Sequence, residues 1–285
     1  MKLCRFLTSL QTPAVGILAD DATIIDLSPA RITSLSELLE SNDLPARMRE
    51  LTDENLPRLA LADVQLLAPV DRQEIWAAGV TYLRSRKARM EESEFSATAY
   101  DKVYEAPRPE LFFKSVPEKV AGPGDFVGIR ADATWSVPEP ELALVFNSRG
   151  HLAGFTIGND MSSRDIEGEN LLYLPQAKIY EGSCALGPFI TIGTSEAEAR
   201  AWEIEISIER GGAPTFSGKT QVGQIKRSFG ELADYLFRSQ KFPRGVVLLT
   251  GTGIVPPDGF TLWAGDKVSI SISGVGTLEN SVAVV

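Results

Sequence analysis

Hydrophobic and charged residues alternate over residues 202–209, where four apolar side chains share one face of the segment: Trp202, Ile204, Ile206 and Ile208. This period of two predicts a half-buried antiparallel strand. Valine- and isoleucine-rich runs separated by glycine and proline recur through the rest of the chain after about residue 70. Such punctuation is typical of strands joined by turns, so we expect a β-rich region over residues 71–285.

The first 70 residues show a mixed pattern. Apolar runs at 14–20 and 23–28 flank the turn signal Asp20-Asp21 and predict two short strands. Apolar residues spaced i, i+3, i+4 then predict amphipathic helices over 34–41 and 44–53. A later helix is predicted over 228–237, where Ser228 and Glu231 have the spacing of a capping box. We therefore expect a small N-terminal α/β domain over residues 1–70 and a larger domain over 71–285.

Two carboxylates interrupt the apolar run at residues 134–146, which otherwise predicts a buried strand. Residues i and i+2 of a strand point to the same face, so Glu139 and Glu141 project together. Pro140 between them lacks an N–H, which predicts a sheet edge or a bulge at this point. Paired buried carboxylates need a compensating arginine, lysine or divalent metal ion. An exposed edge strand with two solvated glutamates is the simpler interpretation of the motif taken alone.

A third carboxylate, Asp160, follows the next apolar run at 155–158. The intervening turn signal NSRG predicts a hairpin, which would bring Asp160 beside Glu139 and Glu141. Carboxylates without cysteine or histidine favour magnesium, manganese or calcium over zinc. Lys178, among small and apolar residues, is a candidate base, and Glu110 precedes an apolar strand; either one alone is typical of a solvated charge.

The composition limits the classes of molecule that this protein is expected to bind. The formal net charge is −10, which argues against binding to nucleic acid or an anionic membrane surface. Two cysteines cannot form a disulfide framework, and no apolar run approaches the roughly 20 residues of a membrane span. We expect a cytoplasmic protein that acts on a small molecule.

The motifs NDMSSRD, LPQAKIYEGSCALGPF, LLTGTGIVPP and GDKVSISISGVGTLENSV, in this order between about Ile75 and Val285, resemble the fumarylacetoacetate hydrolase superfamily. The resemblance implies a mixed β-sandwich roll that assembles as a homodimer or homotetramer. The family's metal ligands fall on Glu139, Glu141 and Asp160, its active-site lysine on Lys178, its T-G-T threonine on Thr252 and the arginine of its N-D-x-S-x-R-D motif on Arg164.

One departure from the family pattern bears on the reaction. Hydrolases and decarboxylases of the family carry a histidine and a glutamate on a lid helix, and this pair polarises the attacking water. Ser85 and Ala88 occupy those positions here. His151, the only histidine, lies in the predicted hairpin and is expected at the surface. The water-activating pair is therefore absent.

The pattern from RPELFFK to LPQAK instead resembles the branch that dehydrates 2-keto-3-deoxy sugar acids, such as 2-keto-3-deoxy-D-arabinonate, in pentose degradation. The resemblance implies dehydration to a semialdehyde through a metal-stabilised enolate, with Lys178 and Glu110 as the acid–base pair. A carboxyl buried near the apolar Phe112 stays protonated more readily, which favours Lys178 as the base and Glu110 as the acid over the reverse assignment. Arg164 and Thr252 would orient the substrate, and Tyr82 and Ser85 would lie on a lid. Two alternatives stay open. The first is another reaction of the same family, either hydrolysis of acylpyruvate-like or fumarylacetoacetate-like diketo acids or decarboxylation of oxaloacetate. The second is non-enzymatic binding of keto acids.

Overall fold

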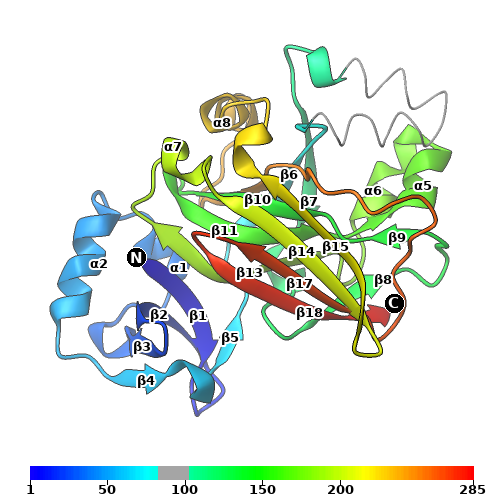
Figure 1. Ribbon diagram of the computed structural model, residues 1–285. Helices are drawn as coiled ribbons and strands as arrows, with labels where there is room; N and C mark the ends of the chain where they lie inside the picture. The colour runs from blue at the N-terminus through cyan, green and yellow to red at the C-terminus, as the bar shows by residue number, and fades with distance from the viewer. Residues whose placement is uncertain (83–102) are drawn as a thin grey trace.

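The structure is a computed structural model that describes residues 1–82 and 103–285. Within these residues, two large β-sheets pack against each other (Figure 1). The larger, mixed sheet has the order β4-β3-β2-β1-β13-β11-β10-β16-β6-β7, with β5 also paired to β1. Its strands are β1 (Lys2–Leu7), β2 (Pro13–Asp20), β3 (Thr23–Asp26), β4 (Arg58–Ala60), β5 (Gln65–Leu67), β6 (Glu74–Gly79), β7 (Glu110–Ser115), β10 (Pro140–Phe146), β11 (Leu152–Asp160), β13 (Cys184–Ile192) and β16 (Val246–Leu249).

The smaller sheet has the order β15-β14-β17-β18-β8, and a separate two-stranded ribbon joins β9 to β12. Their strands are β8 (Phe126–Ile129), β9 (Ser136–Val137), β12 (Ser162–Ser163), β14 (Glu203–Arg210), β15 (Ala213–Gln221), β17 (Lys267–Ile272) and β18 (Gly276–Val284). The predicted alternating strand at 202–209 is β14: its isoleucines are buried, while Ser207 and Glu209 are exposed.

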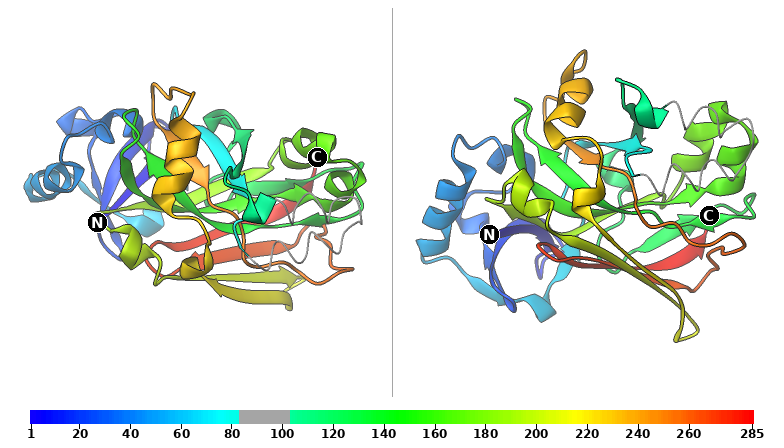
Figure 2. Two further views of the ribbon diagram at one scale, coloured as in Figure 1. Left: turned by 90° about the horizontal axis from the view of Figure 1, so that it is seen from above. Right: turned by 45° about the horizontal axis from the view of Figure 1, so that its top comes forward.

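The described helices are short and lie outside the two sheets (Figure 2). The first two accompany the N-terminal strands, α5 and α6 lie together beside β9 and β12, and α7 and α8 precede and follow the β14–β15 hairpin. Their bounds are α1 (Leu35–Leu38), α2 (Leu44–Asp53), α5 (Arg164–Glu169), α6 (Leu174–Lys178), α7 (Glu196–Ala199) and α8 (Phe229–Phe237). Among the described helices, none has the length and hydrophobicity needed to cross a membrane.

Strand β10 separates two hydrophobic cores. Leu142, Leu144 and Phe146 point into the core between the two sheets. Ala143 and Val145, which alternate with them, point to the opposite face of the larger sheet, where α1 and α2 contribute to a second core. A strand buried on both faces is a rigid place from which to project polar side chains, because its neighbours fix its position.

The N-terminal strands continue the larger sheet. Strand β1 pairs antiparallel with β13, with Lys2 opposite Thr191 and Leu3 opposite Ile190. The predicted strands and helices of this region are present as β2, β3, α1 and α2. The division at residue 70 stays a prediction, since one hydrogen-bonded sheet crosses it.

Two local expectations can be compared with the structure. Pro140 is the first residue of an interior strand, but the ladder from β10 to β16 begins only at Ala143, so at Pro140 the strand is paired on one side only, as at an edge. Its missing N–H therefore costs no ladder bond on that side. At α8, the Ser228 hydroxyl caps the Glu231 N–H as predicted. The Glu231 carboxylate, however, pairs with Arg227, so this end of α8 shows the Ser228 half of the predicted capping box.

Candidate active site

Three carboxylates share one face of the larger sheet where β10 and β11 run antiparallel. Glu141 pairs with Gly158, and continuing this register places Glu139 opposite Asp160. Glu141 lies on the same face because it is two residues from Glu139. One carboxylate oxygen from each of the three lies within 4.8 Å of the others. None of the three is more than 3% exposed, so the predicted triad is a buried cluster.

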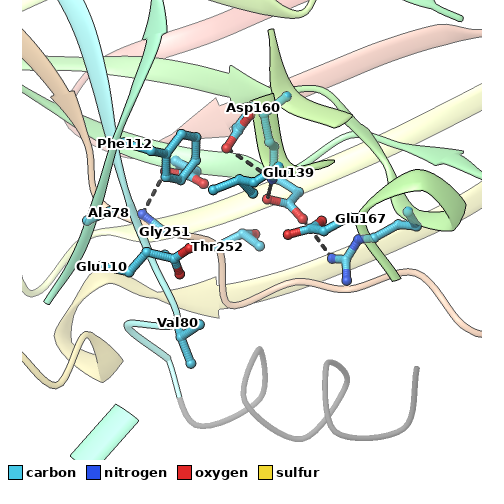
Figure 3. Close-up of a pocket in the computed structure, with 14 residues that line it drawn as sticks. Ala78, Val80, Glu110, Phe112, Glu139, Asp160, Glu167, Gly251 and Thr252 are labelled. Atoms are coloured by element: carbon cyan, nitrogen blue, oxygen red, sulfur yellow. Dashed lines mark hydrogen bonds and ion pairs between the residues drawn. The ribbon is translucent and has the colours of Figure 1, made fainter. Parts of the chain in front are cut away.

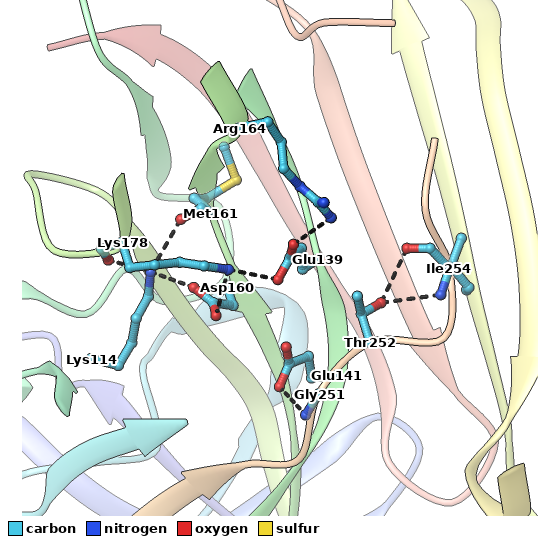
Figure 4. A network of polar contacts seen from close by, with 10 residues as sticks. All are labelled: Lys114, Glu139, Glu141, Asp160, Met161, Arg164, Lys178, Gly251, Thr252 and Ile254. Atoms are coloured by element: carbon cyan, nitrogen blue, oxygen red, sulfur yellow. Dashed lines mark hydrogen bonds and ion pairs between the residues drawn. The ribbon is translucent and has the colours of Figure 1, made fainter. Parts of the chain in front are cut away.

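Two predicted cations hold this cluster together (Figure 4). Lys178, the last residue of α6, places Nζ 2.7 Å from Glu139 Oε2 and 3.1 Å from Asp160 Oδ2. Arg164, the first residue of α5, places Nη2 2.7 Å from Glu139 Oε1. Both cations are nearly inaccessible to solvent. Buried ion pairs of this kind are held by mutual compensation, so removing one partner leaves an uncompensated charge.

The sequence reasoning missed a third cation, Lys114. Its Nζ lies 2.5 Å from Asp160 Oδ1, donates to the Met161 carbonyl at 3.1 Å and also donates to the Lys178 carbonyl. The signal was present in the ELFFKS segment, because residues i, i+2 and i+4 of a strand share a face. Strand β7 therefore presents Glu110, Phe112 and Lys114 together, and a strand assignment alone would have grouped them.

Burial changes the electrostatic state of the Glu141 carboxyl. Desolvation raises the pKa of its carboxyl well above the ordinary value, and the charges of Asp160 and Glu139 raise it further. The Gly251 N–H donates to Glu141 Oε2 at 2.6 Å. Gly251 has φ +89°, and a Cβ there would come within 2.1 Å of Thr81 Oγ1, so the contact depends on glycine.

A small pocket lies over the triad (Figure 3). Glu110 lies on its wall as the first residue of β7, opposite Gly79 of β6. A Cβ at position 79 would approach Glu110 Oε2 to 2.1 Å, so this glycine makes room for the carboxylate. Phe112 forms the adjoining wall, with its ring centre 5.9 Å from Lys178 Nζ. The predicted acid and base therefore face the same pocket.

Thr252 and Glu167 complete the polar lining. The Thr252 hydroxyl donates to the Ile254 carbonyl at 3.1 Å and accepts from the Ile254 N–H at 3.2 Å. Glu167, which our sequence reasoning did not assign to the site, is 2% exposed and shares the inner face of α5 with Arg164. The i, i+3 spacing of these two residues could have indicated it once Arg164 was assigned.

The charges at the pocket suit a divalent cation. Five described carboxylates, Glu110, Glu139, Glu141, Asp160 and Glu167, meet three described cations, Lys114, Lys178 and Arg164, which gives a formal charge of −2. The three triad oxygens are hard ligands of the kind that magnesium, manganese and calcium bind. A positive charge beside Glu141 would lower this raised pKa and stabilise the ionised carboxylate.

The other candidates lie apart from the pocket or outside the description. Tyr82 is 1% exposed and packs in the core between the sheets, and it is not among the pocket-lining residues. Ser85 and Ala88 lie outside the described residues. The roles given to Tyr82 and Ser85 stay predictions. His151 is exposed, as expected.

The family comparison now adds to this geometry. The family model for the C-terminal part of fumarylacetoacetate hydrolase matches residues 74–283. The chain belongs to the fumarylacetoacetate hydrolase family. The predicted family and its β-rich fold are thereby confirmed, and the match begins at β6.

Two relatives within the family are similar over nearly the whole chain. A probable 2-keto-3-deoxyxylonate dehydratase from Haloferax volcanii is 44% identical over 94% of this chain and 90% of its own length. A 2-dehydro-3-deoxy-D-arabinonate dehydratase from Saccharolobus solfataricus is 38% identical over 99% of this chain and 96% of its own length.

A solved structure is similar at the level of the fold. A 2-keto-3-deoxy-D-arabinonate dehydratase complexed with magnesium and 2,5-dioxopentanoate superposes with a TM-score of 0.85 at 34% identity, covering 100% of this chain and 99% of the other. The similarity therefore extends through the N-terminal strands as well as the part matched by the family model.

Proposed function

We propose that this protein is a magnesium-dependent hydro-lyase that dehydrates a 2-keto-3-deoxy sugar acid, such as 2-keto-3-deoxy-D-arabinonate. The observation that carries the proposal is the buried triad of Glu139, Glu141 and Asp160, which faces the same pocket as Lys178 and Glu110. The names of the similar dehydratases support the substrate class.

Magnesium would be held by the three triad carboxylates. When bound there, it supplies a positive charge to the carboxylate and 2-keto oxygens of the substrate, which makes the C3 protons more acidic. Arg164 holds Glu139, and Lys114 holds Asp160, so the ligand carboxylates are positioned before the metal arrives. Gly251 does the same for Glu141.

Lys178 and Glu110 would move the protons. In its neutral amine form, the Lys178 side chain would take a proton from C3 of the substrate, and the Glu110 carboxyl would give a proton to the C4 hydroxyl, which leaves as water. For a five-carbon substrate, loss of water and tautomerisation give 2,5-dioxopentanoate, the compound named in the similar complex. The apolar Phe112 wall beside both groups favours proton transfer between them and the substrate over exchange with solvent.

Arg164 and Thr252 would orient the substrate. Both line the pocket, and a guanidinium matches the geometry of a carboxylate. Tyr82 and Ser85 are kept as candidates for contact with the sugar chain through a lid.

One assay separates this function from its alternatives. The protein is incubated with magnesium and, separately, with 2-keto-3-deoxy-D-arabinonate, its C4 epimer, an acylpyruvate or oxaloacetate. A semialdehyde formed from a sugar acid supports the dehydratase. Cleavage products indicate a C–C hydrolase, carbon dioxide indicates a decarboxylase, and magnesium-dependent binding without turnover indicates a keto-acid binder.

We further propose a homodimer or homotetramer in the cytoplasm. The family resemblance supports the assembly, and the absence of a disulfide framework and of a membrane-spanning helix among the described residues agrees with the compartment. Light scattering of the purified protein tests the assembly, and fractionation of the source cells tests the compartment.

A further inference from the structure

One peptide group beside the metal triad is held at both of its polar ends. Its N–H, which belongs to Gly251, donates to Glu141 Oε2 at 2.6 Å (Figure 4). Its carbonyl, which belongs to Thr250, accepts from the Thr81 hydroxyl, also at 2.6 Å. The N–H and the C=O of a planar trans peptide point in opposite directions, so the hydroxyl and the carboxylate lie on opposite sides of this group.

This chain of two hydrogen bonds is shielded from water. Thr81 is 1% exposed, Thr250 is fully buried, and Glu141 is 2% exposed. In surroundings of low dielectric constant, successive hydrogen bonds polarise and strengthen one another. The Thr81 hydroxyl draws electron density towards the carbonyl oxygen, which makes the Gly251 N–H a stronger donor. Thr81 therefore supports the Glu141 carboxylate through the peptide group.

Packing holds Thr81 in the position that this hydrogen bond needs. A Cβ at Gly251 would come within 2.1 Å of Thr81 Oγ1, and a Cβ at Gly253 would come within 2.5 Å of the Tyr82 ring. Two consecutive side chains thus fit against two glycines that flank Thr252, a pocket-lining residue. The segment that carries Thr81 therefore fixes the turn beside the triad as well as one peptide group in it.

We infer that Thr81 is a positioning residue for magnesium, which holds the 250–251 peptide so that its N–H fixes Glu141 as a metal ligand. The inference rests on the proposed function, since it takes the triad as the magnesium site. Thr81 is not among the pocket-lining residues, so its effect reaches the metal through Glu141 and not through the substrate.

Magnesium binding to metal-free protein, measured by isothermal calorimetry, tests this inference. Thr81→Val keeps the shape of the side chain and removes the hydroxyl. We expect it to weaken magnesium binding by about 3–10-fold, less than the 10–100-fold typical of a group that contacts a metal ligand directly. Thr81→Ser keeps the hydroxyl and should retain the natural affinity. If Thr81→Val does not fold, Thr81→Ala removes the same hydroxyl and carries the same expectation.

Thr191→Val is the matched control. The Thr191 hydroxyl is also buried and also donates to a backbone carbonyl, that of Gly274, at 2.8 Å. Thr191 is not among the pocket-lining residues. Its substitution should lower the midpoint of urea unfolding, as Thr81→Val should, because each removes one buried hydrogen bond. Only Thr81→Val should weaken magnesium binding, so the metal affinity separates a positioning role from a merely structural one.

A double-mutant cycle shows whether Thr81 acts through Glu141. Glu141→Gln removes the carboxylate that the 250–251 peptide supports. Adding Thr81→Val to this protein should therefore change its remaining magnesium affinity by less than about twofold, because the two substitutions interrupt the same chain of contacts.

Two results would overturn the inference. One is a folded Thr81→Val protein that binds magnesium as the natural chain does or no more weakly than Thr81→Ser. The other is an effect of Thr81→Val that is as large in the Glu141→Gln protein as in the natural chain. Thr81-dependent magnesium binding by a chain that dehydrates no sugar acid would contradict the proposed reaction and support the role of Thr81. Dehydration with magnesium binding that is independent of Thr81 would do the reverse.

Discussion

Two strands of this protein carry the same E-x-E motif and use it in opposite ways. On β14, Glu203 and Glu205 face solvent and contact Lys219 of β15. On β10 and the residue before it, Glu141 and Glu139 are buried beside Asp160. The Glu205 side chain is 43% exposed, whereas Glu141 is only 2% exposed.

The electrostatic consequence has opposite signs at the two motifs. The hydrogen bond from Lys219 lowers the pKa of Glu205, whereas burial raises the pKa of Glu141. The E-x-E motif therefore does not determine the pKa of its glutamates. Their surroundings determine it, because β14 has one solvated face, whereas β10 is buried on both faces and lies beside a third carboxylate.

The largest difference should come from the two lysines. Lys178→Ala should lower kcat for sugar-acid dehydration by about 10²–10⁴-fold, because it removes the proposed base. Lys219→Ala, which breaks the exposed pairs of β14, should leave kcat unchanged. Steady-state kinetics on both variants check this, and equal turnover in the two would remove Lys178 from the mechanism.

A stability difference should follow from the buried cation Lys114. Replacing it with methionine leaves Asp160 without one of its two partners and should cost about 3–5 kcal/mol of unfolding free energy. Lys219→Met should have no measurable effect, since its partners are solvated. Urea unfolding in EDTA gives both values, and an unaltered Lys114→Met midpoint would contradict the ion-pair account.

Substitutions at Glu141 and at Glu205 should have different effects on the affinity for magnesium. Glu141→Gln should weaken magnesium binding by at least about 10–100-fold, because it removes a ligand rather than a group that supports one. The same change at Glu205 should leave the affinity as it was. Isothermal calorimetry measures both, and equal constants for the natural chain and Glu141→Gln would place the metal elsewhere.

The smallest expected effect is a pH dependence of that affinity. The raised pKa of Glu141 means that its proton competes with the metal at a pH where an ordinary glutamate is already ionised. Magnesium binding should therefore weaken as the pH falls through this raised pKa and should release protons. Calorimetry in buffers of different ionisation enthalpy detects the release, and proton-independent binding would contradict the assignment.

The sequence was sufficient to predict that the three carboxylates of the triad lie together, because the period of the strand and the hairpin turn determine which carboxylates meet. It was not sufficient to decide between the two E-x-E motifs: both are flanked by apolar residues, and only the three-dimensional neighbours show that β10 is covered on both sides. The family resemblance made that choice.

Lys114 and Glu167 were not assigned to the site from the sequence, and the physical reason is the same for both. Lys114 lies near the end of the apolar strand β7, and its ammonium group donates to the Lys178 carbonyl at the end of α6. Glu167 belongs to a polar, turn-rich segment that forms the short helix α5. Local spacing groups each of them with an assigned residue, but only the tertiary contacts show that both are buried at the pocket.

The central claim is that the buried triad binds magnesium and thereby enables dehydration. It is tested most directly by titrating metal-free protein with magnesium while following semialdehyde formation from 2-keto-3-deoxy-D-arabinonate and from its C4 epimer. We expect turnover of one of them to rise in proportion to occupancy of one metal per chain and to vanish in EDTA. Turnover that persists in EDTA, or full occupancy without product from either epimer, would contradict the account.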